Sequence, residues 1–218
     1  AALPRLAEGC RAITEYAAGK GIRTMVENHG YFCQDSTRVE QLVNAVNHPN
    51  FGLLIDIGNF TCADDESGRA VGRLKNFAFH CHAKDFHLKP GTEPCPGRGW
   101  NMSRGGNWWR GAIVGHGNIP VAQCIRILVK NGYDGVFSIE FEGLEDVLFG
   151  IELGQENLRR FVEMPKPELF SERCRQPQAL PPVLSLRYID ADFSFSTGSL
   201  DLCCNFPDIA WACAVAAQ

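Results

Sequence analysis

The chain has 218 residues, of which 45% are hydrophobic and 21% are charged, a composition typical of a folded globular protein rather than a disordered or collagen-like one. Its formal net charge of −4 argues against a nucleic-acid partner, because binding to phosphate backbones depends on lysine and arginine. No apolar run is long enough to span a bilayer and the first residues lack a signal-peptide pattern, so we expect a cytoplasmic protein with no membrane partner.

Amphipathic helical patterns alternate with short apolar runs from residue 1 to about residue 163, as in a series of βα units. Helices are predicted over residues 3–20, 36–46, 67–75, 120–130 and 144–163. Strands are predicted over residues 22–27, 51–56, 76–82 and 136–141. Strands separated by helices pair in parallel, so we expect an α/β fold whose strand carboxyl ends meet on one face.

Several residues mark the predicted helix ends. Ser36 is predicted to be the N-cap of the second helix, and Pro120 suits the first turn of the fourth. Gly132 ends that helix. Glu145 and Asp146 are predicted to serve the first turn of the last helix, where negative charge is favourable.

Two segments depart from the βα pattern. Residues 83–119 are rich in glycine, proline and tryptophan and are predicted to form a long loop, whose aromatic and arginine content favours a cover over a substrate. Residues 164–218 show no defensible period and are predicted to form an irregular C-terminal tail beyond a domain of residues 1–163. The cysteines before the tail contain no C-x-x-C pair, so we expect free thiols rather than a zinc site or disulfides.

Each predicted strand ends in a residue able to bind a metal. These residues are Glu27, Asp56, His82 and Glu140. A carboxylate among apolar strand residues is costly unless it is paired or metal-bound, and a shared cation would offset that cost for the whole set. Three carboxylates and one imidazole suit a single divalent ion, with Mn²⁺, Mg²⁺ or Co²⁺ favoured and Zn²⁺ possible.

The runs at 26–30, 56–59, 80–85, 115–120 and 132–146 resemble the xylose isomerase-like family of sugar phosphate isomerases and epimerases, and the similarity covers residues 1 to about 163. That family folds as a (β/α)₈ TIM barrel, so the resemblance implies a partial barrel of about four βα units, equivalent to strands five to eight. It also implies that Glu27, Asp56, His82 and Glu140 hold one divalent ion. His82 is preferred to His80, because in related ketose epimerases the second histidine of a His-x-His pair is the ligand.

The resemblance implies an isomerase or epimerase that transfers a proton through a metal-stabilised enediolate. Its substrate would be a small sugar, a sugar phosphate or a related polyol ketone. Glu27 and Glu140 would act as both ligands and acid/base groups. Predicted substrate-binding residues are His29, Asn59, Lys84, Arg110, His116 and Glu142. For two of them a plainer role stays open: Asn59 as a helix cap, and Glu142 as a group behind Glu140.

Three other functions were weighed against this one. An inosose-type dehydratase on the same fold would use the same metal to activate a β-hydroxyl leaving group. A truncated fragment that binds metal without catalysis is the other alternative, because only four of the eight barrel strands are recognisable. The strand edges left open by the missing half favour a homo-oligomer. Apurinic-site endonucleases share the fold but need a histidine-rich three-zinc cluster and a basic face, and the six histidines and negative charge of this chain argue against that function.

Overall fold

The structure, a computed structural model, describes residues 2–164 and 212–213. Its helices are α1 (Ala2–Ala18), α2 (Ser36–Val46), α3 (Asn59–Cys62), α4 (Ser67–Leu74), α5 (Val121–Lys130) and α6 (Val147–Glu163), with a 3₁₀ turn at Lys75–Phe77. Its strands are β1 (Thr24–Glu27), β2 (Phe51–Asp56), β3 (Ala78–Ala83), β4 (Asp85–Lys89), β5 (Asn101–Met102), β6 (Trp108–Ala112), β7 (Phe137–Ile139) and β8 (Ala212–Cys213). None of the helices in these two ranges is long and apolar enough to cross a membrane. Apart from Met164 and β8, the predicted C-terminal tail lies outside the described residues.

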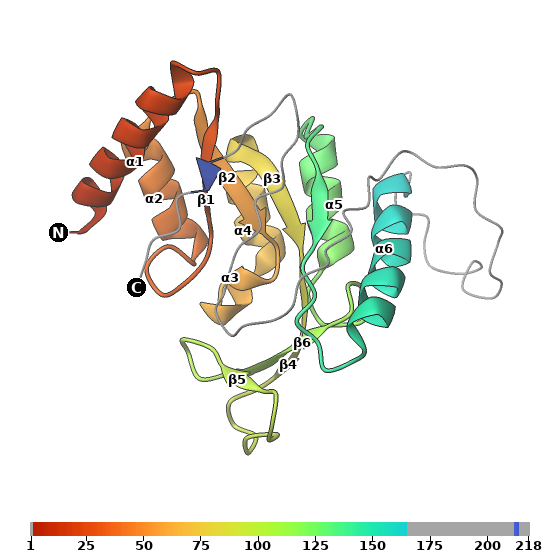
Figure 1. Cartoon of the computed structure of the whole chain (residues 1–218). Coiled ribbons are helices and arrows are strands. Elements are labelled where there is room, and N and C mark those ends of the chain that lie inside the picture. Colours follow the sequence, from red (N-terminus) through yellow and green to blue (C-terminus); the bar gives the residue numbers. More distant parts are fainter. Residues whose placement is uncertain (1, 165–211, 214–218) are drawn as a thin grey trace, which may run out of the picture. The chain divides into compact units, whose positions relative to one another are not determined.

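The main sheet has the order β7-β3-β2-β1-β8, and every neighbouring pair is parallel (Figure 1). The α/β fold with a parallel sheet is therefore confirmed, and each of the four predicted strands exists within one to two residues of its expected bounds. β8 adds two residues beside Thr24 and Met25, on the edge of β1 that was expected to be open. Within the described part of the chain, β7 pairs only with β3.

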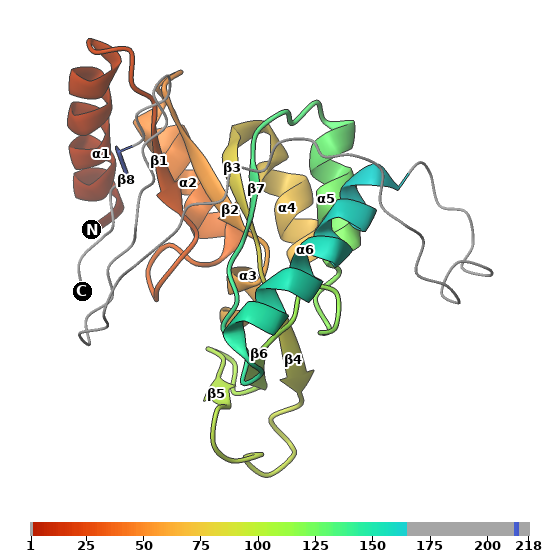
Figure 2. The ribbon, with the colours of Figure 1, turned by 45° about the vertical axis from the view of Figure 1, so that its right-hand side comes forward.

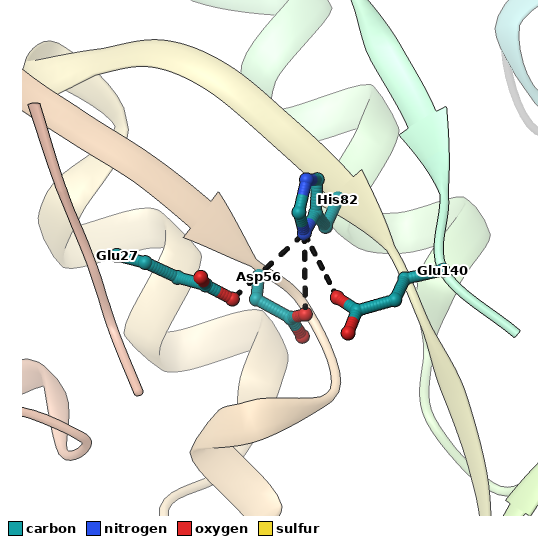
Figure 3. A group of neighbouring side chains, drawn as sticks. All are labelled: Glu27, Asp56, His82 and Glu140. Atoms are coloured by element: carbon teal, nitrogen blue, oxygen red, sulfur yellow. Dashed lines mark hydrogen bonds and ion pairs between the residues drawn. The ribbon is translucent and has the colours of Figure 1, made fainter. Parts of the chain in front are cut away.

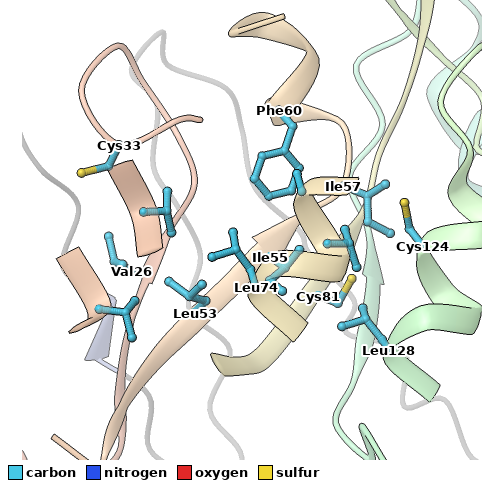
Figure 4. Close-up of a cluster of buried hydrophobic side chains, with 14 of the residues drawn as sticks. Val26, Cys33, Leu53, Ile55, Ile57, Phe60, Leu74, Cys81, Cys124 and Leu128 are labelled. Atoms are coloured by element: carbon cyan, nitrogen blue, oxygen red, sulfur yellow. The ribbon is translucent and has the colours of Figure 1, made fainter. Parts of the chain in front are cut away.

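Helices α2, α4 and α5 cover one face of this sheet (Figure 2). Val26, Leu53, Ile55 and Cys81 point from the strands into the core that these helices complete (Figure 4). Burying each of the valine, leucine and isoleucine side chains contributes roughly 1.5–3 kcal/mol. Successive residues of a strand point to opposite faces, so the core residues leave their neighbours on the other face. The next residues along these strands are Glu27, Asp56 and His82.

The second helix is capped by Asp35 and not by Ser36. The extended backbone of Asp35 lets its carboxylate accept the backbone N–H of Arg38 at 3.0 Å. Ser36 is the first helical residue, and its backbone N–H donates to Asp65 at 2.9 Å. The prediction failed because both residue types are good caps and only the backbone geometry distinguishes them.

The other predicted helix ends were partly correct. Gly132 follows α5 with a left-handed φ of +83°, as expected, whereas Pro120 precedes the helix as its cap residue. The last helix begins at Val147, so Glu145 lies before it rather than in its first turn. Asp146 accepts the backbone N–H of Phe149 at 3.0 Å and caps this helix.

The segment predicted as a long loop contains a second sheet, which is antiparallel and has the order β4-β6-β5. Phe86 of β4 and Trp109 of β6 pack with ring centroids 4.6 Å apart, and Phe86 is fully buried. The glycines and prolines between these strands obscured their alternating pattern in the sequence. The expectation of a long irregular loop was therefore wrong, while a role of this segment as a substrate cover stays a prediction.

The carboxylate of Asp85 joins this small sheet to the chain that follows it. Asp85 is 1% exposed, and its two oxygens accept four backbone N–H groups. The donors are Phe86 at 2.8 Å, Gly115 and Gly117 at 2.9 Å each, and Ile119 at 3.1 Å. One carboxylate thus satisfies the N–H of Phe86 in β4 and those of three residues in the loop after β6, which have no strand or helix to pair with.

We expect Asp85→Asn to lower the free energy of unfolding by at least about 2 kcal/mol, because one oxygen that accepts two N–H groups becomes a donor that faces them. Urea unfolding followed by circular dichroism measures the change, with the exposed Asp134→Asn as the control. Equal midpoints for the two variants would show that Asp85 is dispensable.

Candidate metal centre

Four side chains converge at the carboxyl end of the main sheet. Glu27 and Asp56 are the last residues of β1 and β2, His82 is the next-to-last residue of β3, and Glu140 directly follows β7. The parallel register sets Asp56 beside His82. One nitrogen or oxygen atom from each of the four residues lies within 4.8 Å of the others. Figure 3 shows the four side chains pointing toward one another.

His82 lies at the middle of this cluster. Its Nδ1 is 2.9 Å from Glu140 Oε2, 3.7 Å from Asp56 Oδ2 and 3.8 Å from Glu27 Oε1 (Figure 3). One imidazole nitrogen therefore faces three carboxylates, which is a donor set that hard divalent cations accept.

His80 points to the same side of β3 but does not face the carboxylates. Its Nε2 is 2.9 Å from Ser138 Oγ, and its ring meets the His82 ring edge-on with centroids 5.4 Å apart. Burial, followed by the charge on His82, lowers the pKa of His80 to about 4. His80 is therefore neutral near pH 7 and packs edge-on against the His82 ring.

Asp56 provides the strongest indication that this cluster is built for a cation. Its side chain is fully buried, and Oδ1 accepts the backbone N–H groups of Gly58 at 2.8 Å and Asn59 at 2.9 Å. Oδ2 is also buried but accepts no hydrogen bond from the residues described, although Lys84 Nζ lies 3.3 Å away. Lys84 offsets the charge of Oδ2 but donates no hydrogen bond to it, so this oxygen can still bind a cation and the residues present fit a divalent ion.

Lys84, Asn59 and Glu142, which were predicted to bind substrate, also lie at the cluster. The Lys84 ammonium is 2.8 Å from Glu140, 3.3 Å from Asp56 and 3.6 Å from Glu142. Burial opposes the charge on Lys84, but the carboxylates of Asp56 and Glu140 outweigh it and raise the Lys84 pKa above its ordinary value. Lys84 is thus a fixed positive charge beside the carboxylates.

The remaining predicted substrate-binding residues lie outside the cluster of four. His29 is exposed and close enough to Glu27 to favour its ionised form. Arg110 lies 3.8 Å from Glu145 and over the ring of Trp100, and no contact described for residues 2–164 joins it to the cluster. His116 is exposed in the loop after β6. Their substrate contacts stay predictions.

Asn28 is a residue of the site that we did not predict. It is 1% exposed, its Nδ2 donates to the Asp56 carbonyl at 2.9 Å, and its Oδ1 accepts the Asp56 N–H at 2.7 Å. These two bonds fix the end of β2 against the end of β1. The signal in the sequence was an asparagine directly after Glu27 at the end of an apolar strand, where its amide needs partners for both of its polar atoms.

The cluster perturbs the pKa of its own members. Burial and then the negative charges of Asp56 and Glu140 raise the pKa of Glu27 to about 7. For His82, burial is outweighed by the carboxylates of Asp56 and Glu140, which raise its pKa to about 9. For Glu140, burial is outweighed by His82 and Lys84, which lower its pKa. Without metal, Glu27 and His82 therefore hold protons that a cation would replace.

We expect the metal-free protein to become less stable as pH rises from about 6.5 to about 9.5, because Glu27 and His82 both have raised pKa values when folded. Such groups stabilise the folded state most at low pH, and this stabilisation is lost as pH passes about 7 for Glu27 and about 9 for His82. Below about pH 6.5 the lowered pKa of His80 opposes this trend, because the unfolded chain binds a proton there that the folded His80 does not. Thermal unfolding in EDTA measures the trend. Glu27→Gln should remove the loss of stability that occurs up to about pH 7. An unfolding temperature that rises with pH over this range would contradict the assigned protonation.

Comparisons with known proteins agree with this geometry. Residues 1–161 match the family described as Xylose isomerase-like TIM barrel. The inosose dehydratase of Bacillus licheniformis is 26% identical over 149 residues, which are 68% of this chain and 49% of that protein. This chain spans about half the length of the curated relatives that it matches.

Two solved structures share the fold. A xylose isomerase-like TIM barrel protein from Mycobacterium smegmatis in complex with magnesium has a TM-score of 0.57 at 18% identity, over 74% of this chain and 51% of that one. The D-allulose 3-epimerase from a Methylomonas species has a TM-score of 0.54 at 15% identity, over 71% and 54%. With its parallel sheet and its family match over residues 1–161, this chain belongs to the xylose isomerase-like TIM barrel family.

Proposed function

We propose that the chain is the metal-binding part of a divalent-metal-dependent isomerase or epimerase acting on a small sugar, a sugar phosphate or a related polyol ketone. The observation that carries the proposal is the convergence of three carboxylates and one imidazole from four strands around a buried Asp56 oxygen without a hydrogen-bond donor. Family membership supports the reaction class, and the named epimerase among the similar structures supports the kind of substrate.

Glu27, Asp56, His82 and Glu140 would hold one divalent ion, with Mg²⁺, Mn²⁺ and Co²⁺ as the best fits to this donor set. When bound, the ion supplies a positive charge that polarises the substrate's carbonyl and hydroxyl oxygens and acidifies the neighbouring C–H bond. His82 must lose its proton to become a ligand, and Asp56 presents Oδ2, because its Oδ1 is held by two backbone N–H groups.

Glu27 and Glu140 are the proposed acid/base pair. The strand order places β1 and β7 on opposite sides of β2 and β3, so the two glutamates flank Asp56 and His82. A substrate between them would present one face to each carboxylate. One glutamate would take the carbon-bound proton and the other would return a proton, either to the opposite face in an epimerisation or at the neighbouring carbon in an isomerisation.

Contacts to the rest of the substrate are proposed for four residues outside the group of Glu27, Asp56, His82 and Glu140. His29 and Glu142 flank the cluster from the ends of β1 and β7, and Arg110 and His116 lie on and after β6. Asn59 bonds to Glu27 and orients it toward the same space. Imidazole, carboxylate and guanidinium groups would match the hydroxyl or phosphate oxygens of a sugar.

A dehydratase is the second candidate, because a curated relative of this chain is an inosose dehydratase. The same base would remove the proton next to the carbonyl, and the β-hydroxyl group would leave as water after it accepts a proton. The two reactions therefore share their first step and differ in their product.

We expect Mn²⁺ binding to release about one proton per ion near pH 8, from His82, and about two near pH 6, where Glu27 also holds a proton. Affinity should accordingly fall as pH falls. Isothermal titration calorimetry in buffers of different ionisation enthalpy measures both quantities. Asp56→Asn should abolish binding while Asp134→Asn preserves it, and binding that survives in the first variant would exclude this centre.

We expect the metal-loaded protein to exchange a carbon-bound hydrogen of its substrate with solvent. Incubation with Mn²⁺ or Mg²⁺ and a panel of ketoses, ketose phosphates and inosose in D₂O, followed by NMR, measures the incorporation of deuterium. Glu140→Gln should lower the exchange rate by at least about 100-fold, because it removes the proposed base. Glu163→Gln on the exposed end of α6 is the matched control.

The outcome of the same experiment separates the candidates. Deuterium in an isomeric product supports the isomerase or epimerase, and a product that lacks water supports the dehydratase. If the protein binds metal but incorporates deuterium into no compound of the panel, both reactions are rejected for this chain. The chain would then be a fragment that only binds metal.

A further inference from the structure

Lys84 contacts more members of the candidate metal centre than a residue that only binds substrate would need. Its ammonium bonds to Glu140 Oε1 at 2.8 Å and lies 3.3 Å from Asp56 Oδ2. It also donates to Asn59 Oδ1 at 3.3 Å, and the Nδ2 of Asn59 donates to Glu27 Oε1 at 3.2 Å. Lys84 is therefore linked to all three carboxylates, to two directly and to Glu27 through one amide.

The fold also provides a fitted place for this side chain. Only 2% of the Lys84 side chain is exposed. Its aliphatic stem passes over Gly58, where an added Cβ would lie 2.9 Å from Cγ and 3.1 Å from Cβ of Lys84. The loop after β2 thus needs a residue without a side chain at position 58, and the lysine stem fills the space.

The geometry points to Lys84 as a positioning residue that holds Glu27, Asp56 and Glu140 in the arrangement that receives the metal ion, an inference that rests on the proposed metal centre. Three carboxylates this close repel one another, and a buried ammonium offsets the repulsion while it fixes their rotamers. Because Lys84 binds Oε1 of Glu140, Oε2 is left facing His82. Each carboxylate then presents a defined oxygen to the metal position. Residues that hydrogen-bond to metal ligands commonly orient them in this way.

A lysine beside a cation site has a second effect that makes the inference testable. Its positive charge repels the ion, so a lysine without a positioning role would weaken metal binding, and its removal would tighten binding. A lysine that positions the ligands has the opposite consequence. The sign of the change in affinity therefore separates the two roles.

We expect Lys84→Met, which keeps the stem and removes the charge, to weaken Mn²⁺ binding by about tenfold or more. Gly58→Ala should act in the same direction with a smaller effect, because it displaces the lysine stem without removing any charge. Gly72→Ala is the matched control, since nothing lies within 4 Å of a Cβ at that position of α4. Calorimetry measures the affinities.

The electron paramagnetic resonance spectrum of the bound Mn²⁺ provides a readout that a purely structural role would not move. Lys84→Met and Gly58→Ala should change its fine structure, because the ligand arrangement changes, whereas Gly72→Ala should not. Asn59→Ala removes the amide that joins Lys84 to Glu27 but leaves the contacts of Lys84 with Asp56 and Glu140. Its effect should be smaller than additive with that of Lys84→Met, because both act through one network.

Affinity within twofold of the wild type or tighter in Lys84→Met, together with an unchanged spectrum, would overturn the inference. If circular dichroism shows that Lys84→Met does not fold, Gly58→Ala decides by the same criteria. Failure of the wild-type protein to bind Mn²⁺ would instead reject the proposed metal centre itself, so the two failures are distinguishable.

Discussion

The alternation of side chains across a parallel sheet is the constraint on which the rest of this structure depends. Val26, Ile55 and Cys81 enter the core beneath the helices, so the next residues along their strands must point to the other face. Because the strands run in one direction, those residues meet at the same end of the sheet. The packing of the core and the convergence of Glu27, Asp56 and His82 are thus two results of one geometry.

Charge balance explains how such a cluster is tolerated in the absence of metal. The positive charges of His82 and Lys84 face the carboxylates of Asp56 and Glu140, and Glu27 holds its proton to about pH 7. In the proposed metal-bound state, a divalent ion replaces the protons of Glu27 and His82 while Lys84 keeps its charge. Below about pH 7, where Glu27 holds a proton, the local charge is then the same with and without the ion, which limits the cost of burying these groups in either state.

Contacts between distant segments decided the parts of the fold that sequence patterns missed. The strands and helices of the βα units follow period-two and period-3.6 patterns, and they were predicted closely. The β4-β6-β5 sheet was not, because glycine and proline interrupt its pattern and its order depends on Phe86 meeting Trp109 and on Asp85 binding the later loop. The cap at Asp35 instead of Ser36 was likewise set by backbone geometry.

The sequence by itself determined the α/β fold and the four ligand-type residues, because each is the polar end of an apolar strand and such a position follows from the local pattern. Only the tertiary structure decided what surrounds them. The structure buries Lys84 against Asn59 and Asp56, while its contact with a substrate stays a prediction. It also gives Asn28 two bonds to Asp56 that the sequence did not indicate. These partners lie 25 to 28 residues away along the chain, and no local periodicity records that separation.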